Sequence, residues 1–122
     1  MPALGPFVLY YHTACTVFWG RAFAPVAILK LAGAEYTIKP APESPSSGFA
    51  VPMVTFPGGY TISQTPVIVH SLGKHFGMVG SGDADDFVSN QLLADSADFL
   101  GEIFAGKPGI ILNNYIIYYF IS

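Results

Sequence analysis

A β-hairpin signal and a helix start stand next to each other in the middle of this chain. The runs Val51–Phe56 and Tyr60–Ile62 are rich in β-prone residues, and Pro57-Gly58-Gly59 between them is typical of a tight turn. A helix is then expected to open at Thr65-Pro66, because threonine is a good N-cap and proline is favoured at the first helical position. Gly77 is the expected end of that helix. Few folds contain an antiparallel pair of strands that is followed directly by a helix, so this order of elements strongly limits the fold of the chain.

The N-terminal part adds a strand, a helix and a second strand. Phe7–Tyr11 is long enough for one buried strand, and Val17–Ala32 has helical apolar spacing with Gly33 at the place of a C-terminal cap. Pro25 removes a backbone donor, so the first turns of this helix are expected to be irregular. Tyr36–Lys39 is expected to be a short strand that joins the first through a parallel, right-handed crossover. Together with the hairpin and its helix, this order predicts an α/β fold with a thioredoxin-like βαβ–ββα layout over residues 1–80.

Two further segments follow that unit. A polar link leads to a long helix, predicted at Ala84–Ala105, and the chain then carries an apolar tail over residues 107–122. The tail has no charged side chain after Lys107, and a β-prone stretch of this kind is an aggregation hazard when exposed. We therefore expect residues 109–121 to be buried, against the chain's own fold, in a neighbour's sheet or against a membrane protein.

The composition limits which classes of partner and which cellular location are expected for this chain. Charged residues make up 11% of the chain, against roughly 25% in ordinary soluble domains. Apolar surface is therefore expected to meet a protein partner, either a second copy or a larger complex. A net charge of −3 with five basic residues argues against nucleic acid. No signal peptide and no transmembrane span is expected, and an intracellular location follows, cytoplasmic by default or in an organellar complex. The three histidines lack metal-ligand spacing, so no metal is expected.

The segment Val51–Met78, VPMVTFPGGYTISQTPVIVHSLGKHFGM, resembles the glutathione-binding half of the glutathione transferases. The matching pattern is a Val-Pro pair, two strands around a turn, a Gln-Ser pair (here Gln64-Thr65) and a helix that ends in Leu-x-x-x-Phe-Gly. Gly20-Arg21-Ala22 and the stretch Leu31–Tyr36 are similar to the family's first helix and second strand. The resemblance covers about residues 7–105, so residues 81–106 correspond to the first helix of the family's all-helical second domain, here truncated.

The resemblance implies a glutathione site. It implies that Pro52 is cis and that the backbone of Val51 pairs with the cysteinyl part of glutathione. It also implies that Gln64 and Thr65 hold the γ-glutamyl carboxylate at a helix N-terminus, where free N–H groups and the helix dipole favour an anion. The alternative is that Thr65 only caps the helix and Gln64 is a solvated turn residue.

The group that activates the glutathione thiol is left open among three residues. A hydroxyl at the end of the first strand stabilises the thiolate in many family members, and Tyr10 and Tyr11 both stand there. Side chains alternate along a strand, so only one of the two can face the ligand. Cys15 is the third candidate, since one branch of the family places a cysteine at the start of the first helix. Its simpler interpretation is a small buried apolar residue.

Two functions remain. In the first, the chain binds glutathione as a substrate and conjugates it to a hydrophobic electrophile. In the second, it is a non-catalytic, transferase-derived interaction subunit of a larger complex. The low charge, the truncated second domain and the apolar tail favour the second. The Val51-Pro52 and Gln64-Thr65 pairs favour glutathione binding, so a glutathione transferase-type protein is the primary interpretation. A disulfide exchanger is excluded, because Cys15 is the only cysteine.

Overall fold

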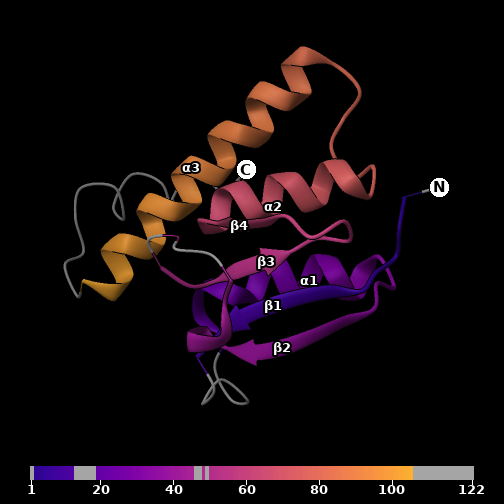
Figure 1. Cartoon of the computed structure of the whole chain (residues 1–122). Helices are drawn as coiled ribbons and strands as arrows, with labels where there is room; N and C mark the ends of the chain where they lie inside the picture. The colour runs from indigo at the N-terminus through magenta and orange to yellow at the C-terminus, as the bar shows by residue number, and fades with distance from the viewer. Residues whose placement is uncertain (1, 13–18, 46–47, 49, 106–122) are drawn as a thin grey trace.

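The structure is a computed structural model that describes residues 2–12, 19–45, 48 and 50–105. Its elements follow the predicted order along the chain (Figure 1). In sequence they are β1 (Phe7–Tyr11), the 3-10 turn η1 (Gly20–Ala22), α1 (Phe23–Leu31), β2 (Tyr36–Pro40), the 3-10 turn η2 (Ala41–Glu43), β3 (Met53–Thr55), β4 (Thr61–Ser63), α2 (Thr65–His75) and α3 (Asp83–Phe104). The tail and Cys15 lie outside the described residues, so the predictions on them stay predictions.

The four strands form one sheet in the order β2-β1-β3-β4. β1 pairs with β2 in parallel, whereas β3 is antiparallel to both β1 and β4. This topology is the predicted βαβ unit extended by a hairpin, so the α/β class and the thioredoxin-like layout are confirmed. The strand Phe7–Tyr11 has the predicted bounds. β3 is shorter than expected, because Val51 and Pro52 precede the paired region, whereas β4 has the expected length and begins one residue later than predicted.

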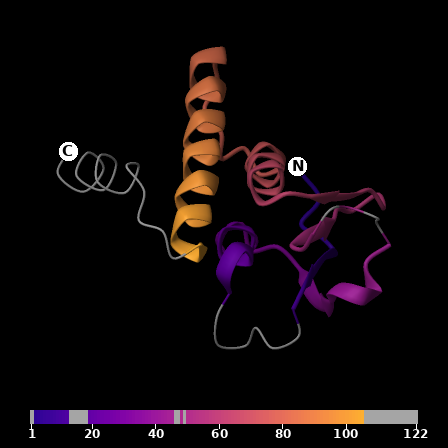
Figure 2. The ribbon, with the colours of Figure 1, turned by 90° about the vertical axis from the view of Figure 1, so that its left-hand side faces the viewer.

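The helices stand on one side of the sheet in two layers. Figure 2 shows α1 and α2 against one face of the sheet, with α3 beyond them. Their contact with the sheet is the hydrophobic core, which centres on Phe7, Leu9, Val54 and Phe56 from the strands and on Val26, Leu29, Ile68 and Leu72 from the helices. The opposite face is covered at one end by the chain around η2, where the Ser44 hydroxyl donates to Met53 Sδ at 2.9 Å. Burial of one sheet face explains why the predicted strands and helices hold together.

The first helix begins later than predicted. The chain enters through the 3-10 turn η1, and the α-helix starts only at Phe23. Pro25 lies in its first turn, where the missing backbone N–H costs nothing. The irregular part is the 3-10 turn Gly20–Ala22, while Pro25 itself lies within the regular α-helix, so the expected effect of Pro25 on the first turns is not what the structure shows. The predicted start of the helix at Val17 lies outside the described residues. Gly33 follows the helix with φ of +65°, as a left-handed cap requires.

The second helix corrects one prediction. The sequence predicts Thr65 as the N-cap of α2, but Thr65 is the first helical residue, and Gln64 occupies the N-cap. The prediction is wrong by one residue because the Gln64 backbone adopts φ 73°. A positive φ is unusual for glutamine, so there was no reason in the sequence to expect it there. At the other end Gly77 has φ of +67° and Met78 N–H donates to the carbonyl of Gly73 at 2.8 Å, which confirms the predicted stop.

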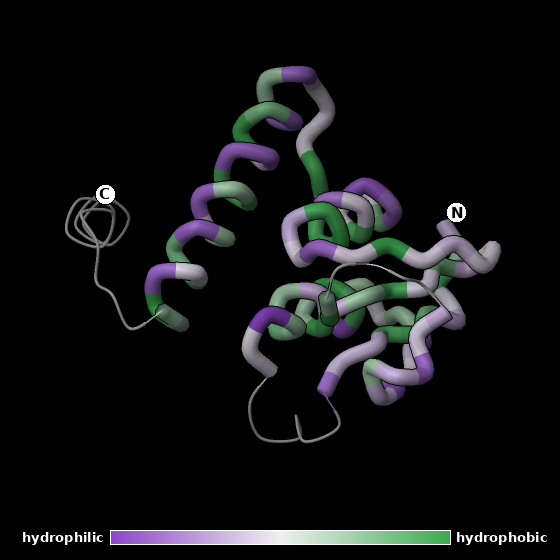
Figure 3. The backbone as a smooth tube through the Cα atoms, turned by 60° about the vertical axis from the view of Figure 1, so that its left-hand side comes forward, coloured by the Kyte–Doolittle hydropathy of each residue, from purple (hydrophilic) through white to green (hydrophobic). Residues whose placement is uncertain are grey.

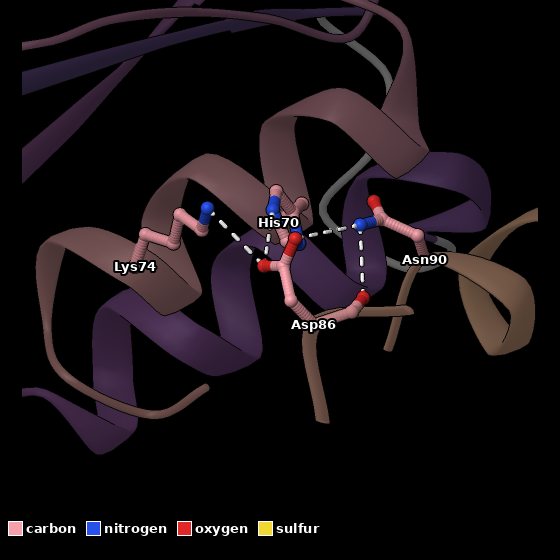
Figure 4. A network of polar contacts seen from close by, with 4 residues as sticks. All are labelled: His70, Lys74, Asp86 and Asn90. Atoms are coloured by element: carbon pink, nitrogen blue, oxygen red, sulfur yellow. Dashed lines mark hydrogen bonds and ion pairs between the residues drawn. The ribbon is translucent and has the colours of Figure 1, made fainter. Parts of the chain in front are cut away.

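A polar network joins α2 to α3 (Figure 4). Asp86 Oδ1 lies 3.1 Å from Lys74 Nζ and 3.3 Å from His70 Nε2. The Asn90 side-chain amide donates to the Asp86 carbonyl at 2.9 Å. His75, by contrast, packs its ring on phenylalanine side chains, and its Nε2 lies 2.7 Å from the Ala3 carbonyl. His12 has a ring contact as well, with Tyr11 at 4.9 Å between ring centroids, so each of the three histidines has a structural neighbour.

In the part of the chain that the structure describes, no helix is both long and apolar enough to cross a membrane. The same residues contain no group of three or more His, Cys, Asp or Glu side chains that could hold a metal ion.

Candidate functional site

A cavity of about 320 Å³ lies where η1, the start of β3, the start of α2 and α3 meet. All four residues that the sequence assigned to glutathione binding line it: Val51, Pro52, Gln64 and Thr65. The other described residues that line it are Arg21, Ala50, Pro66 and Ala97. The fold therefore gathers side chains from distant parts of the sequence around one hollow.

The Val51-Pro52 peptide bond is cis, as the resemblance implied. Pro52 is buried and Val51 is half-buried, and both come just before the first paired residue of β3. Their backbone stands beside the cavity at the end of the sheet's central strands.

Gln64 is held in an unusual backbone conformation at the rim. Among the described residues it is the one non-glycine residue with positive φ. Such a conformation costs a residue with a side chain roughly 1–3 kcal/mol, and it tends to persist at functional sites. The Gln64 side chain is exposed and makes no cap hydrogen bond to the helix, so it is oriented by the turn and not by capping.

Thr65 fixes the start of α2 to the segment before α1. Its hydroxyl donates to the Arg21 backbone carbonyl at 3.2 Å, across 44 positions of sequence. This distance is longer than the usual O–H···O range of about 2.5–3.0 Å, so the bond is on the weak side. The hydroxyl therefore joins two walls of the cavity and remains able to turn to a stronger acceptor.

The electrostatics of the cavity favour an anion. Arg21 is the one charged side chain among the described lining residues, and it carries a permanent positive charge. The first N–H groups of α2 have no partner within the helix, and they give its N-terminus a partial positive charge. Proline at position 66 contributes no N–H, which leaves the amides of Thr65 and Val67 as the donors of the first turn. A carboxylate is the natural ligand for this end.

The two candidate tyrosines lie on opposite faces of the sheet. Tyr11 belongs to the core cluster under the helices, together with Phe7 and Leu9 of the same strand. Tyr10 alternates to the other face, and it pairs in register with Met53 of β3. Both are buried, and neither lines the cavity. Only Tyr11 shares its face of the sheet with η1 and α2, the elements that carry Arg21 and Thr65.

Four lining residues were not predicted as part of the site: Arg21, Ala50, Pro66 and Ala97. Arg21 appeared in the sequence only as part of the Gly20-Arg21-Ala22 match, and its position in a 3-10 turn beside α2 could not be derived from periodicity. Ala97 carries no chemical signal at all. It lines the cavity because α3 passes behind α2 at that point.

The fold is that of a thioredoxin-like domain with an added long helix. More particularly, it is the arrangement found in the N-terminal half of nematode glutathione transferases. It is similar to a Nu-class transferase from Haemonchus contortus (23% identity, TM-score 0.63, covering 79% of this chain and 48% of that one). It is also similar to the transferase NaGST1 (24%, TM-score 0.66, 80% and 48%). A third is a C. elegans transferase (18%, TM-score 0.64, 93% and 58%).

These likenesses concern the fold. The chain spans about half the length of the transferases that it matches. No protein-family model matches the sequence, and no curated protein matches it significantly.

Proposed function

We propose that this chain binds glutathione in the cavity between η1, β3 and α2, and that it is a glutathione transferase-type protein. The observation that carries the proposal is the convergence of Val51, Pro52, Gln64 and Thr65 on one cavity, where Arg21 is the only charged side chain among the described lining residues. Glutathione is a tripeptide with a carboxylate at its γ-glutamyl end, an extended backbone and a thiol. The cavity offers a suitable surface for the first two of these parts, while Tyr11, the proposed partner of the thiol, is not among its lining residues.

The γ-glutamyl carboxylate is proposed to lie at the N-terminus of α2. There it would accept from the amides of the first turn and from the Thr65 hydroxyl, with Arg21 among the residues that line the same cavity. The Gln64 side chain stands at the rim and can contact the same end of the ligand. The Val51 backbone can pair with the cysteinyl part, since it precedes the paired region of β3.

Tyr11 is the proposed partner of the thiol. A free thiol has a pKa near 8.5, so at neutral pH only a small fraction is thiolate. A hydroxyl that donates to the sulfur stabilises the thiolate, and the thiol proton passes to solvent. The thiolate then attacks an electrophilic carbon and displaces its leaving group, which departs with the electron pair of the broken bond. The location of Tyr11 on the helix-covered face, at the strand end that leads toward η1, supports it over Tyr10. Conjugation to a hydrophobic electrophile is the reaction that this pairing would serve.

Titration calorimetry of the full chain with reduced glutathione tests the binding proposal. The matched control ligand is the dipeptide Cys-Gly, which keeps the thiol but lacks the γ-glutamyl carboxylate. We expect saturable binding of glutathione and at least roughly tenfold weaker binding of the dipeptide, since one charged hydrogen bond is worth about 1.5–3 kcal/mol. Absence of binding at millimolar glutathione would instead favour a non-catalytic interaction subunit. Equal affinity for both ligands would show that the γ-glutamyl carboxylate does not bind at the N-terminus of α2.

A further inference from the structure

A serine or threonine is followed directly by proline at two places in this sequence, Ser44-Pro45 and Thr65-Pro66. This pair of residues is the motif that proline-directed protein kinases phosphorylate. Ser44 matches it more fully, because Pro42 stands two residues before it, as in the Pro-x-Ser-Pro pattern that mitogen-activated protein kinases prefer. A motif this short needs a fitting structural context, and the two places differ in theirs.

The backbone at Ser44 already has the extended form in which a kinase binds its substrate segment. Ser44 follows η2 with φ of −63° and ψ of 132°, a conformation that the proline after it favours. Ser44 is half-buried, and its neighbours Pro42, Glu43 and Pro45 are exposed. Figure 2 shows η2 at the outer edge of the sheet, on the side away from α3, and it lies at the edge of the domain in Figure 3 as well.

The other motif lies in a different context. Thr65 is the first residue of α2, it is half-buried, and its hydroxyl donates to the Arg21 carbonyl at 3.2 Å. An extended conformation at this position would require the first turn of α2 to unwind. The structure therefore favours Ser44 over Thr65 as a kinase substrate.

The Ser44 hydroxyl fastens its segment to the sheet. It donates to Met53 Sδ at 2.9 Å, and Met53, the first residue of β3, is only 5% exposed. The backbone at Gly48 closes on the same side chain, since a Cβ there would lie 3.2 Å from Met53 Cε and 2.7 Å from Ser63 Oγ. The chain then continues into Ala50–Pro52, which line the cavity. Met53 is therefore the anchor of the segment that leads from η2 to the cavity wall.

A phosphate on Ser44 would not be compatible with this anchor. It adds a charge of about −1.5 to −2 and accepts hydrogen bonds, whereas the hydroxyl donates one to the sulfur. A thioether is only a weak acceptor, so Met53 offers the phosphate no donor. Burial of such an anion against an apolar side chain is costly, and the neighbouring Glu43 carboxylate repels it. The phosphorylated residue is therefore expected to leave the sheet.

From these observations we propose that Ser44 is phosphorylated by a proline-directed kinase and that the phosphate releases η2 from Met53. In the transfer step the Ser44 hydroxyl oxygen forms a bond to the γ-phosphorus of ATP. The bond from that phosphorus to the bridging oxygen breaks, ADP leaves with the electron pair, and the hydroxyl proton passes to a base of the kinase. The proposal goes beyond glutathione binding and does not depend on it.

Treatment of the full chain with a purified mitogen-activated protein kinase and ATP tests the site. We expect a single phosphate, which mass spectrometry of peptides places on Ser44. Ser44→Ala should lose it, whereas the control Thr65→Val should take up as much phosphate as the parent. Absence of phosphate from the parent would overturn the proposal, and so would phosphate on Thr65 with Ser44 unmodified.

Oxidation by dilute hydrogen peroxide tests the release of η2. Met78 is 48% exposed, so it is an internal control for Met53 in the same molecule. After phosphorylation we expect Met53 to form its sulfoxide at least roughly fivefold faster relative to Met78, and a phosphatase should restore the slow rate. Unchanged Met53 oxidation would show that η2 stays on the sheet and would refute the release. Fast oxidation that persists after phosphatase treatment would refute it too, because the phosphate would not be its cause.

Discussion

Replacing Thr65 by valine separates the two roles that this residue can have at the cavity. Valine keeps the branched shape and removes the hydroxyl, while Thr65→Ser keeps a hydroxyl and serves as the control. A threonine hydroxyl has a single proton to donate. In the unliganded structure that proton goes to the Arg21 carbonyl at 3.2 Å. When a carboxylate binds at the α2 terminus, the hydroxyl can donate instead to the charged acceptor.

The magnitude follows from the difference between two hydrogen bonds. A neutral one contributes about 0.5–1.5 kcal/mol to stability and one to a charged group about 1.5–3 kcal/mol. Thr65→Val should therefore lower the unfolding free energy of the unliganded chain by about 0.5–1.5 kcal/mol. It should weaken glutathione binding by the difference, about 1–1.5 kcal/mol, or roughly five- to tenfold in Kd. Thr65→Ser should stay close to the parent in both.

Urea unfolding and titration calorimetry on the same three proteins measure the two quantities. A loss of stability with unchanged affinity would show that the hydroxyl only ties α2 to η1, so that the carboxylate is held by backbone amides and Arg21 alone. If neither stability nor affinity changes, the hydroxyl takes part in neither bond, and the reasoning from the Arg21 contact is refuted.

Three further substitutions test other parts of the account. Arg21→Met should raise the Kd for glutathione roughly tenfold and flatten its dependence on salt, because the cavity loses its charged side chain; an unchanged salt dependence would remove Arg21 from the site. Tyr11→Phe should lower kcat/KM for conjugation to an aromatic electrophile roughly 100-fold, whereas Tyr10→Phe should leave it within about threefold; the reverse order would place the ligand on the other sheet face. Asp86→Asn should lower the unfolding free energy by about 0.5–1 kcal/mol at low salt and by less at high salt, since its partner Lys74 is largely exposed; a salt-independent loss would show that the ion pair is not its cause.

Much of the fold could be predicted from local signals. The FVLYY run, the Pro-Gly-Gly turn and the capping glycines Gly33 and Gly77 each act within a few residues, and their elements are found in the predicted places. The start of α1 and the cap of α2 were predicted less well. Both depend on backbone conformations at Gly20–Ala22 and Gln64 that arise where η1 and α2 meet, so the sequence of either segment alone does not determine them.

The residues of the candidate site, like the elements of the fold, could be predicted only in part. Val51, Pro52, Gln64 and Thr65 stand at the ends of neighbouring elements, and a fold of the expected topology brings such ends together at one cavity. The alternation along β1 predicted that one tyrosine would face away from the other, but the face of each depends on which side the helices pack. Ala97 could not be predicted from the sequence, because an alanine has no functional group that would mark it as a site residue. It lines the cavity only because α3 passes there.

The most direct test of the proposed glutathione site is a map of backbone amide shifts in nuclear magnetic resonance spectra on addition of reduced glutathione. We expect the largest saturable changes at Val51, Gln64, Thr65 and Val67, around the cavity and the first turn of α2. Residues at the far end of α2, such as His75, should change little. Saturable changes confined to another part of the chain, or no changes at millimolar glutathione, would contradict the proposed site.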